Sequence, residues 1–295
     1  MFYKLRKELK RIPSKTNTRI RCALIILLTI IIFSALKPKR LHKPTCTFSF
    51  VVRNRYQFIR DGIKYFDRFS TKCETSNLIV VENNSHDNSY DILRSFAKNR
   101  DDILIDTFDE RYVKKEGHVD SGGKVCKSTQ IDKRVANLAF VRNRVLQHVD
   151  AKVDFFIVMD IDITIGWKGF NDTIDIMMND NVIPAICANG VNNGTFWDVF
   201  AFRDDVFQWD STKGTVWMVD LAFLTAQHNR VSDELESMKL KPVDSCFSGI
   251  TVYRGDHIRG CKYSGFCGTC EHVYFNQCVR KNKKMLINRD LVVHY

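Results

Sequence analysis

The sequence predicts an α/β fold in which a mixed, mostly parallel sheet lies between helices. Short apolar segments rich in β-formers alternate with helix-like segments through the first half of the chain, which is the pattern of βαβ units. Residues 47–295 are enough for one sizeable core, and they contain neither an internal repeat nor a low-complexity linker. These observations favour a single globular domain with helices on both faces of its sheet.

The predicted elements alternate along the chain. Strands are expected over 47–52, 77–82, 102–108 and 154–164. Helices are expected over 57–69, 90–100 and 134–149. Sheets of this kind bind ligands at the carboxyl ends of their strands, so the polar residues that follow each strand are the first candidates for a functional site.

The net charge of +11 comes entirely from the N-terminal arm. Residues 1–43 hold 12 Lys/Arg and one acid, Glu8, which leaves 33 Lys/Arg against 33 Asp/Glu in the remaining chain. A domain without excess charge lacks the basic face of a nucleic-acid-binding protein. We therefore expect no nucleic-acid partner.

A transmembrane signal anchor is predicted over residues 22–36, which contain no charge. As a helix this run spans roughly 22 Å, short for a ~30 Å hydrocarbon core but suited to a thinner early-secretory bilayer. Eight Lys/Arg precede it and four follow closely, so the basic tail over residues 1–21 is expected in the cytosol. The alternatives are a cleaved signal peptide, although no small-x-small cleavage site follows, and a buried helix, which the basic flanks oppose.

This topology leaves a short stem over residues 37–46 and a luminal domain over residues 47–295, in a type II protein of the Golgi or endoplasmic reticulum membrane. Nine cysteines lie beyond the anchor, and in an oxidising lumen disulfides are favoured over a zinc or redox site at "CGTC". Nine is odd, so one thiol is expected to be free or intermolecular, and the pairing stays open. Sequons at Asn83, Asn171 and Asn193 are available to luminal glycosylation.

Two acids interrupt the end of the apolar stretch "FFIVMDIDIT" over residues 155–164. Strand side chains alternate in direction, so Asp160 and Asp162 are expected to point the same way while Ile161 points into the core. Neighbouring carboxylates repel each other, and a divalent cation removes that cost. Their hard oxygen ligands suit Mn²⁺ or Mg²⁺, which could neutralise charge on a departing diphosphate. Taken alone, D-x-D is a weak signal, because paired surface acids are common.

Two further segments could contribute to a donor site. Glu82 and Asn83 end the second strand and could hold the base or ribose of a nucleotide, although turn and N-cap chemistry also explains them. Arg142 and Arg144 flank Asn143 on the third helix, and arginine suits a diphosphate. An exposed, salt-bridged helix face is the alternative for this second group.

The segment "ICANGVNNGTFWDVFAFRDD" over residues 186–205 contains candidates for an acceptor site. Amide groups and aromatic faces are common where sugars bind, which singles out Asn189, Trp197 and Asp198. The neighbouring phenylalanines are better explained as core residues.

The order of motifs along the chain resembles that of the nucleotide-sugar glycosyltransferases of the GT-A fold. The motifs cover nearly all of residues 47–295 and read VVENNS, VRNRVL, FIVMDIDI, ANG with WDVFAFR, SCFSGITVYR, CEHVYFN and LVVHY. Within that superfamily the helix, the D-x-D and the SCFSGITVYR segment are similar to the fungal capsule-associated mannosyltransferase group. The resemblance implies a GT-A-like sheet and a hexosyltransferase activity, with mannosyl transfer as one candidate.

The resemblance also implies roles for single residues. Asp160 and Asp162 match the D-x-D that holds the metal and the ribose-diphosphate of the donor. Gly249 matches a glycine loop through which the backbone approaches the donor or acceptor sugar, with Ser248 where a second glycine is often found. His294 matches a C-terminal histidine that often supplies a further metal ligand, and terminal packing is the alternative for it.

The catalytic candidates are Glu271 and His272. Glu271 resembles the carboxylate of an acidic acceptor-site motif, and it could take a proton from an acceptor hydroxyl if the chemistry inverts the anomeric centre. His272 stands where a second acid is usual, so the identity of the base stays open between them. A simple pairing of Glu271 with Arg280 or a lysine is the alternative.

Taken together, these features predict a membrane-anchored, metal-dependent glycosyltransferase that moves a sugar from a nucleotide-sugar donor to a hydroxyl of a glycan or glycoprotein acceptor. The donor sugar and base, the acceptor and the stereochemical outcome stay open. A nucleotidyl- or phosphotransferase could use the same paired acids, although no G-x-x-x-x-G-K-[ST] phosphate loop is present. A non-catalytic, membrane-anchored sugar-binding protein is the third reading.

Overall fold

The computed structural model describes residues 42–108, 130–208, 221–265 and 269–295. Within Lys43–Tyr295 the chain forms one compact unit. The predicted tail and anchor lie outside the described residues. In the four described ranges, no helix is both long enough and apolar enough to cross a bilayer.

The order of strands and helices agrees closely with the order predicted from the sequence. The strands are β1 Thr45–Val52, β2 Thr75–Asn83, β3 Ile103–Phe108, β4 Phe155–Met159, β5 Thr164–Ile165, β6 Ala185–Asn192, β7 Thr195–Phe196, β8 Leu240–Val243, β9 Ile250–Arg254 and β10 Met285–His294. The helices are α3 Tyr56–Ser70, α4 Ser89–Ala97, α5 Gln130–Gln147, α6 Trp167–Asn179, α7 Leu221–Ser237, α8 Gly255–Ile258 and α9 Glu271–Arg280. The first three predicted strands and all three predicted helices are confirmed as β1 to β3 and α3 to α5, with ends shifted by a few residues.

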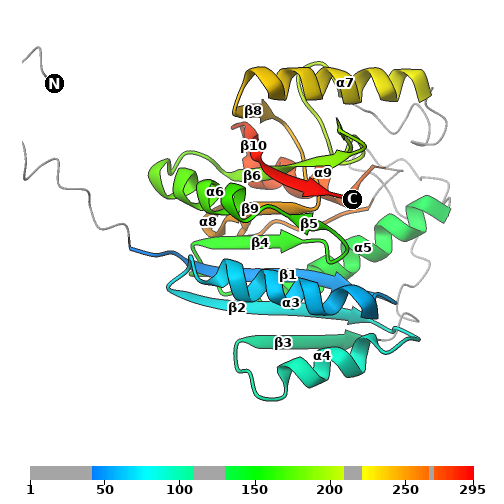
Figure 1. Cartoon of the computed structure of the whole chain (residues 1–295), viewed down its shortest axis with the longest axis vertical. Coiled ribbons are helices and arrows are strands. Elements are labelled where there is room, and N and C mark those ends of the chain that lie inside the picture. Colours follow the sequence, from blue (N-terminus) through cyan, green and yellow to red (C-terminus); the bar gives the residue numbers. More distant parts are fainter. Residues whose placement is uncertain (1–41, 109–129, 209–220, 266–268) are drawn as a thin grey trace, which may run out of the picture. The chain divides into compact units, whose positions relative to one another are not determined.

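Ten strands of the described residues form one mixed sheet, in the order β3-β2-β1-β4-β9-β6-β10-β5, with β7 beside β6 and β8 beside β10 (Figure 1). The strands from β3 to β4 are parallel neighbours. β9 runs antiparallel between β4 and β6, whereas β10 is parallel to β6. The predicted mixed, mostly parallel sheet is confirmed, and its parallel block comes from the first half of the chain.

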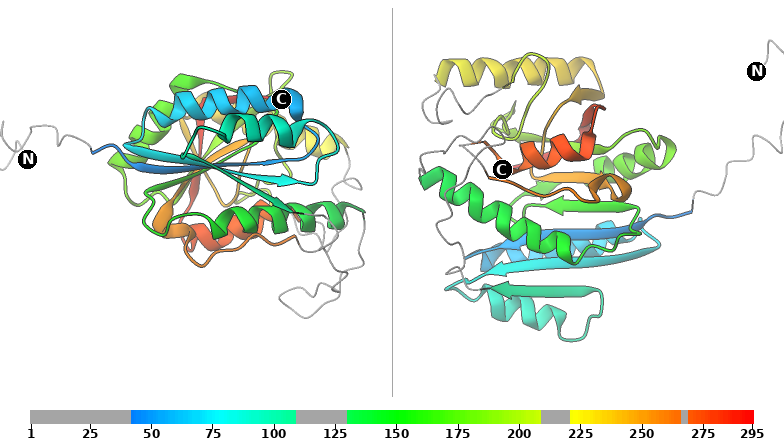
Figure 2. Two further views of the ribbon diagram at one scale, coloured as in Figure 1. Left: turned by 90° about the horizontal axis from the view of Figure 1, so that it is seen from below. Right: turned by 180° about the vertical axis from the view of Figure 1, so that it is seen from behind.

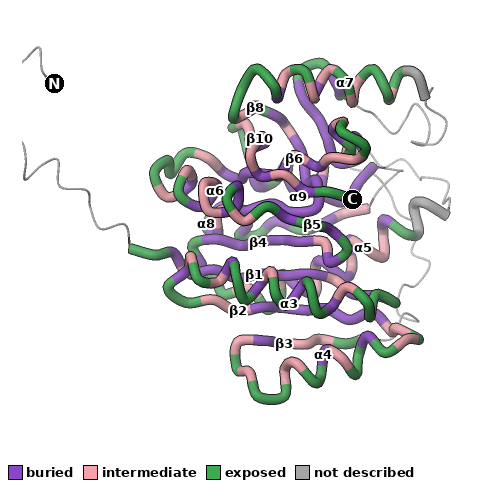
Figure 3. The backbone as a smooth tube through the Cα atoms, in the orientation of Figure 1, coloured by how far each residue is buried: buried purple, intermediate pink, exposed green. Residues whose placement is uncertain are grey.

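Helices cover both faces of this sheet (Figure 2): α3 and α4 lie on one face, and α5 and α9 lie on the other. The strand period of two explains the layering, because Phe48 and Phe50 of β1 point to the α3 face, where Phe66 and Phe69 meet them. The ring of Phe69 stacks on Phe170 of α6 with centroids 4.1 Å apart. The central strands are consequently buried along most of their length (Figure 3).

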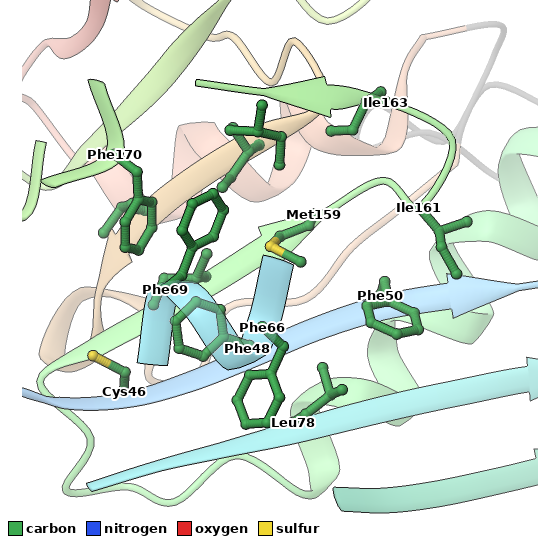
Figure 4. Packing of buried hydrophobic residues seen from close by; sticks show 14 of the residues in the cluster. Cys46, Phe48, Phe50, Phe66, Phe69, Leu78, Met159, Ile161, Ile163 and Phe170 are labelled. Atoms are coloured by element: carbon green, nitrogen blue, oxygen red, sulfur yellow. The ribbon is translucent and has the colours of Figure 1, made fainter. Parts of the chain in front are cut away.

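The predicted fourth strand over 154–164 is wrong in its length. β4 ends at Met159, and the chain rejoins the sheet only at Thr164. Carboxylates inside a central strand would be desolvated at high cost, so the chain leaves the sheet where the acids begin. Ile161 still points into the core, as predicted, and lies beside Phe50 (Figure 4).

Among the described residues, disulfides account for six of the seven cysteines. They join Cys46 to Cys73, Cys187 to Cys246 and Cys261 to Cys278. Cys270 is a buried free thiol, and Cys126 and Cys267 lie outside the described residues. The expectation of disulfides is confirmed for the three described pairs.

Candidate active site

A cavity of about 860 Å³ opens at the carboxyl ends of β1, β2 and β4. Its rim is formed by residues at or just beyond the ends of these strands: Arg53, Arg55, Asn83, Asp160 and Asp162. One wall comes from a stripe of α5 with the spacing of a single helix face: Arg134, Asn137, Leu138 and Val141. The two acids and Asn83 therefore lie at the carboxyl ends of their strands, which is where the sequence led us to look for a site.

The loops after β1 and β2 hold each other in place. Asn54 accepts a hydrogen bond from the backbone N–H of His86 (2.8 Å), and its own N–H donates to Ser85 (2.9 Å). The N–H of Arg55 donates to Ser89 at 3.0 Å. Asn54 has a positive φ of 51°, a conformation that asparagine tolerates better than most residues. This cross-linking fixes the part of the rim that follows β1 and β2.

Arg55 was not among the predicted site residues, yet it pairs with Asp162. Its Nε atom lies 3.2 Å from a carboxylate oxygen of Asp162, and both side chains are exposed. Arg55 follows β1 just as Asn83 ends β2, so the rule that selected Asn83 would have found it.

Asp160 is partly buried beside several other acids. Its side chain is 28% exposed and lies 3.4 Å from Nη2 of Arg142. The pKa of Asp160 is raised to about 7, with burial as the largest cause. Arg142 opposes this rise, and the neighbouring carboxylates of Asp162, Asp198 and Glu271 add to it. The D-x-D pair therefore has an electrostatic cost that a bound cation would relieve.

Glu82 and Asn83 occupy different environments. Glu82 is buried, and its carboxylate accepts a hydrogen bond from the backbone N–H of Ser85 at 2.6 Å. This contact stabilises the turn after β2, which is the alternative to nucleotide binding for Glu82. Asn83 lines the cavity, and its buried Oδ1 has no hydrogen-bond partner among the described residues. Because Asn83 is 8% exposed, a glycan on this sequon would have to occupy the cavity itself.

Residues 142–144 of α5, which carry the two predicted arginines, do not line the cavity. Asn143 is bound at both ends of its amide by the backbone of Tyr263, at 2.9 and 2.8 Å. Arg144 forms a two-nitrogen ion pair with Asp106 of β3, at 3.0 and 2.5 Å. Arg142 turns toward Asp160 and Glu271. The structure thus brings Arg142 to the acids but does not place Asn143 at the cavity.

The predicted catalytic pair lies at the first turn of α9. Glu271 is 3% exposed and accepts a hydrogen bond from Nε of Arg142 at 3.1 Å, rather than pairing with Arg280. His272 stacks on Phe247 with centroids 3.8 Å apart, and neither ring nitrogen has a hydrogen-bond partner within the described ranges. Burial lowers the pKa of His272 well below its usual value, so its ring is neutral.

The glycine loop links the acids to the predicted acceptor side. Ser248 and Gly249 both have positive φ, 53° and 82°. The N–H of Ser248 donates to Asp198 at 2.6 Å, and the carbonyl of Gly249 accepts the N–H of Asp160 at 2.7 Å. Burial raises the pKa of Asp198. The turn is therefore bonded to the side chain of Asp198 and to the backbone of Asp160 at consecutive residues.

Three candidates remain: Trp197, Asn189 and His294. Trp197 is 47% exposed, with its ring 5.7 Å from that of His228, and Asn189 donates to the carbonyl of Arg289 at 3.5 Å. His294 is exposed at the end of β10, paired with Thr164 of β5.

No three His, Cys, Asp or Glu side chains of the described residues form a group that could hold a metal ion. The predicted set of Asp160, Asp162 and His294 is therefore not assembled as a three-residue group.

A mixed sheet with paired acids beside a cavity at its carboxyl edge is the arrangement expected of a GT-A-like glycosyltransferase. Over residues 69–286 the chain matches the family described as cryptococcal mannosyltransferase 1, and it belongs to that family.

Solved structures share the fold at low sequence identity. TarS of S. aureus in complex with UDP has a TM-score of 0.51 and 10% identity, covering 85% of this chain and 60% of the TarS chain. The mannosyltransferase PcManGT from Pyrobaculum calidifontis, in complex with GDP-Man and Mn²⁺, has a TM-score of 0.50 and 12% identity, covering 92% of this chain and 68% of its own. The chain thus spans about three fifths of the TarS chain 1–349. No curated protein matched the sequence.

Proposed function

We propose that the protein is a metal-dependent glycosyltransferase that moves a hexose, mannose being the first candidate, from a nucleotide-sugar donor to a hydroxyl of a glycan or glycoprotein. The observation that supports this most is the position of Asp160 and Asp162 at the rim of the 860 Å³ cavity, in a chain of a mannosyltransferase family. A cavity of this size suits a small cofactor or nucleotide ligand.

The rim residues fit a divalent cation. Asp160 and Asp162 offer hard oxygen ligands, and the raised pKa of Asp160 shows how poorly the protein alone compensates its charge. Mg²⁺ is commonly held by one or two carboxylates and completes its shell with substrate phosphates, so these two acids suffice without His294. A bound Mn²⁺ or Mg²⁺ would neutralise charge on the leaving diphosphate.

The other side chains divide between donor and acceptor. Asn83 and Arg55 face the donor cavity, where an unpartnered amide oxygen can accept a hydroxyl or base N–H. Asn189, Trp197 and Asp198 remain the proposed acceptor side. We assign the base to Glu271 rather than His272, because the ring of His272 is held flat against Phe247.

The membrane topology is part of the same proposal. A type II anchor over residues 22–36 would place the catalytic domain in the Golgi or endoplasmic reticulum lumen, which agrees with the three disulfides. Deleting residues 1–42 should release the protein from membranes with its activity intact. Continued membrane attachment of the shortened protein would contradict the anchor.

The test is a turnover screen of residues 43–295 against nucleotide sugars with Mn²⁺ and glycan acceptors. Release of nucleoside diphosphate with sugar transfer supports the proposal, whereas release of pyrophosphate indicates a nucleotidyltransferase and no turnover indicates a binding protein. Asp162→Ala should reduce transfer by about 10²- to 10³-fold, as the loss of a charge-stabilising group does in other enzymes. Asp172→Ala is the matched control, because Asp172 pairs with Lys168 on α6. Equal activity of both variants would refute the role of the paired acids.

A further inference from the structure

Arg142 bridges two carboxylates that come from different parts of the fold. Its Nε atom lies 3.1 Å from Oε1 of Glu271, and Nη2 lies 3.4 Å from Oδ1 of Asp160. Asp160 follows β4, Glu271 begins α9, and the arginine comes from α5. One guanidinium therefore sets the relation between the acid on the donor side and the acid on the acceptor side.

The guanidinium is itself held in place. It lies 5.0 Å from the ring centroid of Phe247 and 5.9 Å from that of Tyr263. The neighbouring Asn143 binds the backbone of Tyr263 at both ends of its amide, so the same helix fixes a ring beside the guanidinium. With a side chain only 6% exposed, Arg142 has little room to take another conformation.

Arg142 is not among the residues that line the donor cavity. The cavity takes Arg134, Asn137, Leu138 and Val141 from α5, and Arg142 lies on the adjacent face of that helix. Asp160 lines this cavity, whereas the guanidinium of Arg142 lies behind Asp160 at 3.4 Å. Two nitrogens at fixed spacing can hold both acids at once, which a lysine ammonium cannot do in the same geometry.

We propose that Arg142 is a positioning residue that fixes Glu271 relative to Asp160 and does not bind the donor. The inference rests on the proposed function, and it replaces the sequence-based expectation that Arg142 contacts the diphosphate. Its consequence is a separation of kinetic effects: loss of the bridge should slow transfer while donor binding stays intact.

Arg142→Lys and Arg144→Lys form a matched pair for the test. Arg144 lies two residues further along α5 and holds Asp106 through two nitrogens away from the cavity, so its substitution removes the same kind of contact. The measurements are kcat and donor KM for transfer, and the Kd of nucleoside diphosphate with Mn²⁺ by calorimetry. We expect Arg142→Lys to lower kcat about 100-fold, as small misplacements of catalytic groups do, with KM and Kd within about twofold of wild type. Arg144→Lys should keep the wild-type kcat.

Phe247→Leu supplies a second variant if Arg142→Lys does not fold, because it loosens the guanidinium without removing its charge. It should lower kcat with an unchanged Kd.

Three results would overturn the inference: wild-type kcat in the Arg142 or Phe247 variant, a loss of donor binding as large as the loss of kcat, or equal losses of kcat in the two arginine variants. Wild-type protein that neither binds nucleotide nor transfers sugar would instead refute the proposed function, and the inference with it.

Discussion

Asp160 combines burial with close negative neighbours, and this has a consequence for stability. Its pKa is about 7 in the folded protein against about 3.8 in a free chain. Between these pH values the folded state binds a proton that the unfolded state has released, so the free energy of unfolding falls as pH rises through this window.

We therefore expect Asp160→Asn to become relatively more stable at higher pH. In metal-free protein, the difference in unfolding free energy between Asp160→Asn and wild type should be larger at pH 8 than at pH 5. Urea unfolding at both pH values measures it. A difference that is the same at both pH values would show that the pKa of Asp160 is not raised by folding.

Gly249 is the second residue whose environment makes a sharp prediction. With φ at +82°, a Cβ atom there would lie 3.0 Å from the hydroxyl of Tyr295 and 3.0 Å from Cγ1 of Val293. Gly194 has the same φ but nothing within 4 Å. Alanine at Gly194 should cost about 1 kcal/mol through backbone strain alone, whereas alanine at Gly249 should cost about 1–3 kcal/mol more through crowding.

Thermal unfolding of the two glycine variants decides this prediction. Gly249→Ala should also impair donor binding, because the crowding would shift the Gly249 carbonyl that accepts the N–H of Asp160. Equal melting temperatures for Gly249→Ala and Gly194→Ala would contradict the crowding.

At the scale of elements, two disulfides allow stability and activity to be separated. Cys261–Cys278 anchors α9, which carries Glu271, whereas Cys46–Cys73 joins the starts of β1 and β2, at the edge opposite the cavity. Replacing either pair with serine should cost about 3 kcal/mol of unfolding free energy.

Only the loss of Cys261–Cys278 should also lower kcat, because it releases the helix that positions Glu271. Unfolding and turnover measured on both variants test this, and equal effects on turnover would show that α9 is held by other contacts.

The sequence predicted elements better than it predicted the directions of their side chains. Apolar runs located β1, β2 and β3, because the period of two that buries Phe48 and Phe50 is visible in the chain. The end of β4 at Met159 was missed, since an alternating D-x-D still fits a strand until desolvation is considered. The contact of Asn143 with the backbone of Tyr263 was also not visible in the sequence, because the face of α5 that meets the cavity depends on how that helix docks.

At the scale of the whole molecule, the parallel block could be inferred, but the insertion of antiparallel β9 between β4 and β6 could not. That pairing joins segments about 100 residues apart, and local periodicity carries no information on it. The insertion matters for function, because β9 brings the Ser248–Gly249 turn beside Asp160. The rim of the candidate site could thus be predicted from the ends of the strands. The Ser248–Gly249 turn beside it could not, because only tertiary packing brings that turn to Asp160.

The central claim is that Asp160 and Asp162 hold a divalent cation together with the diphosphate of an activated sugar. Calorimetric titration of nucleoside diphosphate with and without Mn²⁺ tests it, using wild type, Asp162→Asn and Asp172→Asn. We predict metal-dependent binding in wild type and Asp172→Asn, and a loss of at least about 100-fold in Asp162→Asn, because even outer partners of metal sites contribute 10- to 100-fold. Binding that is indifferent to Mn²⁺, or equally tight in Asp162→Asn, would contradict the claim.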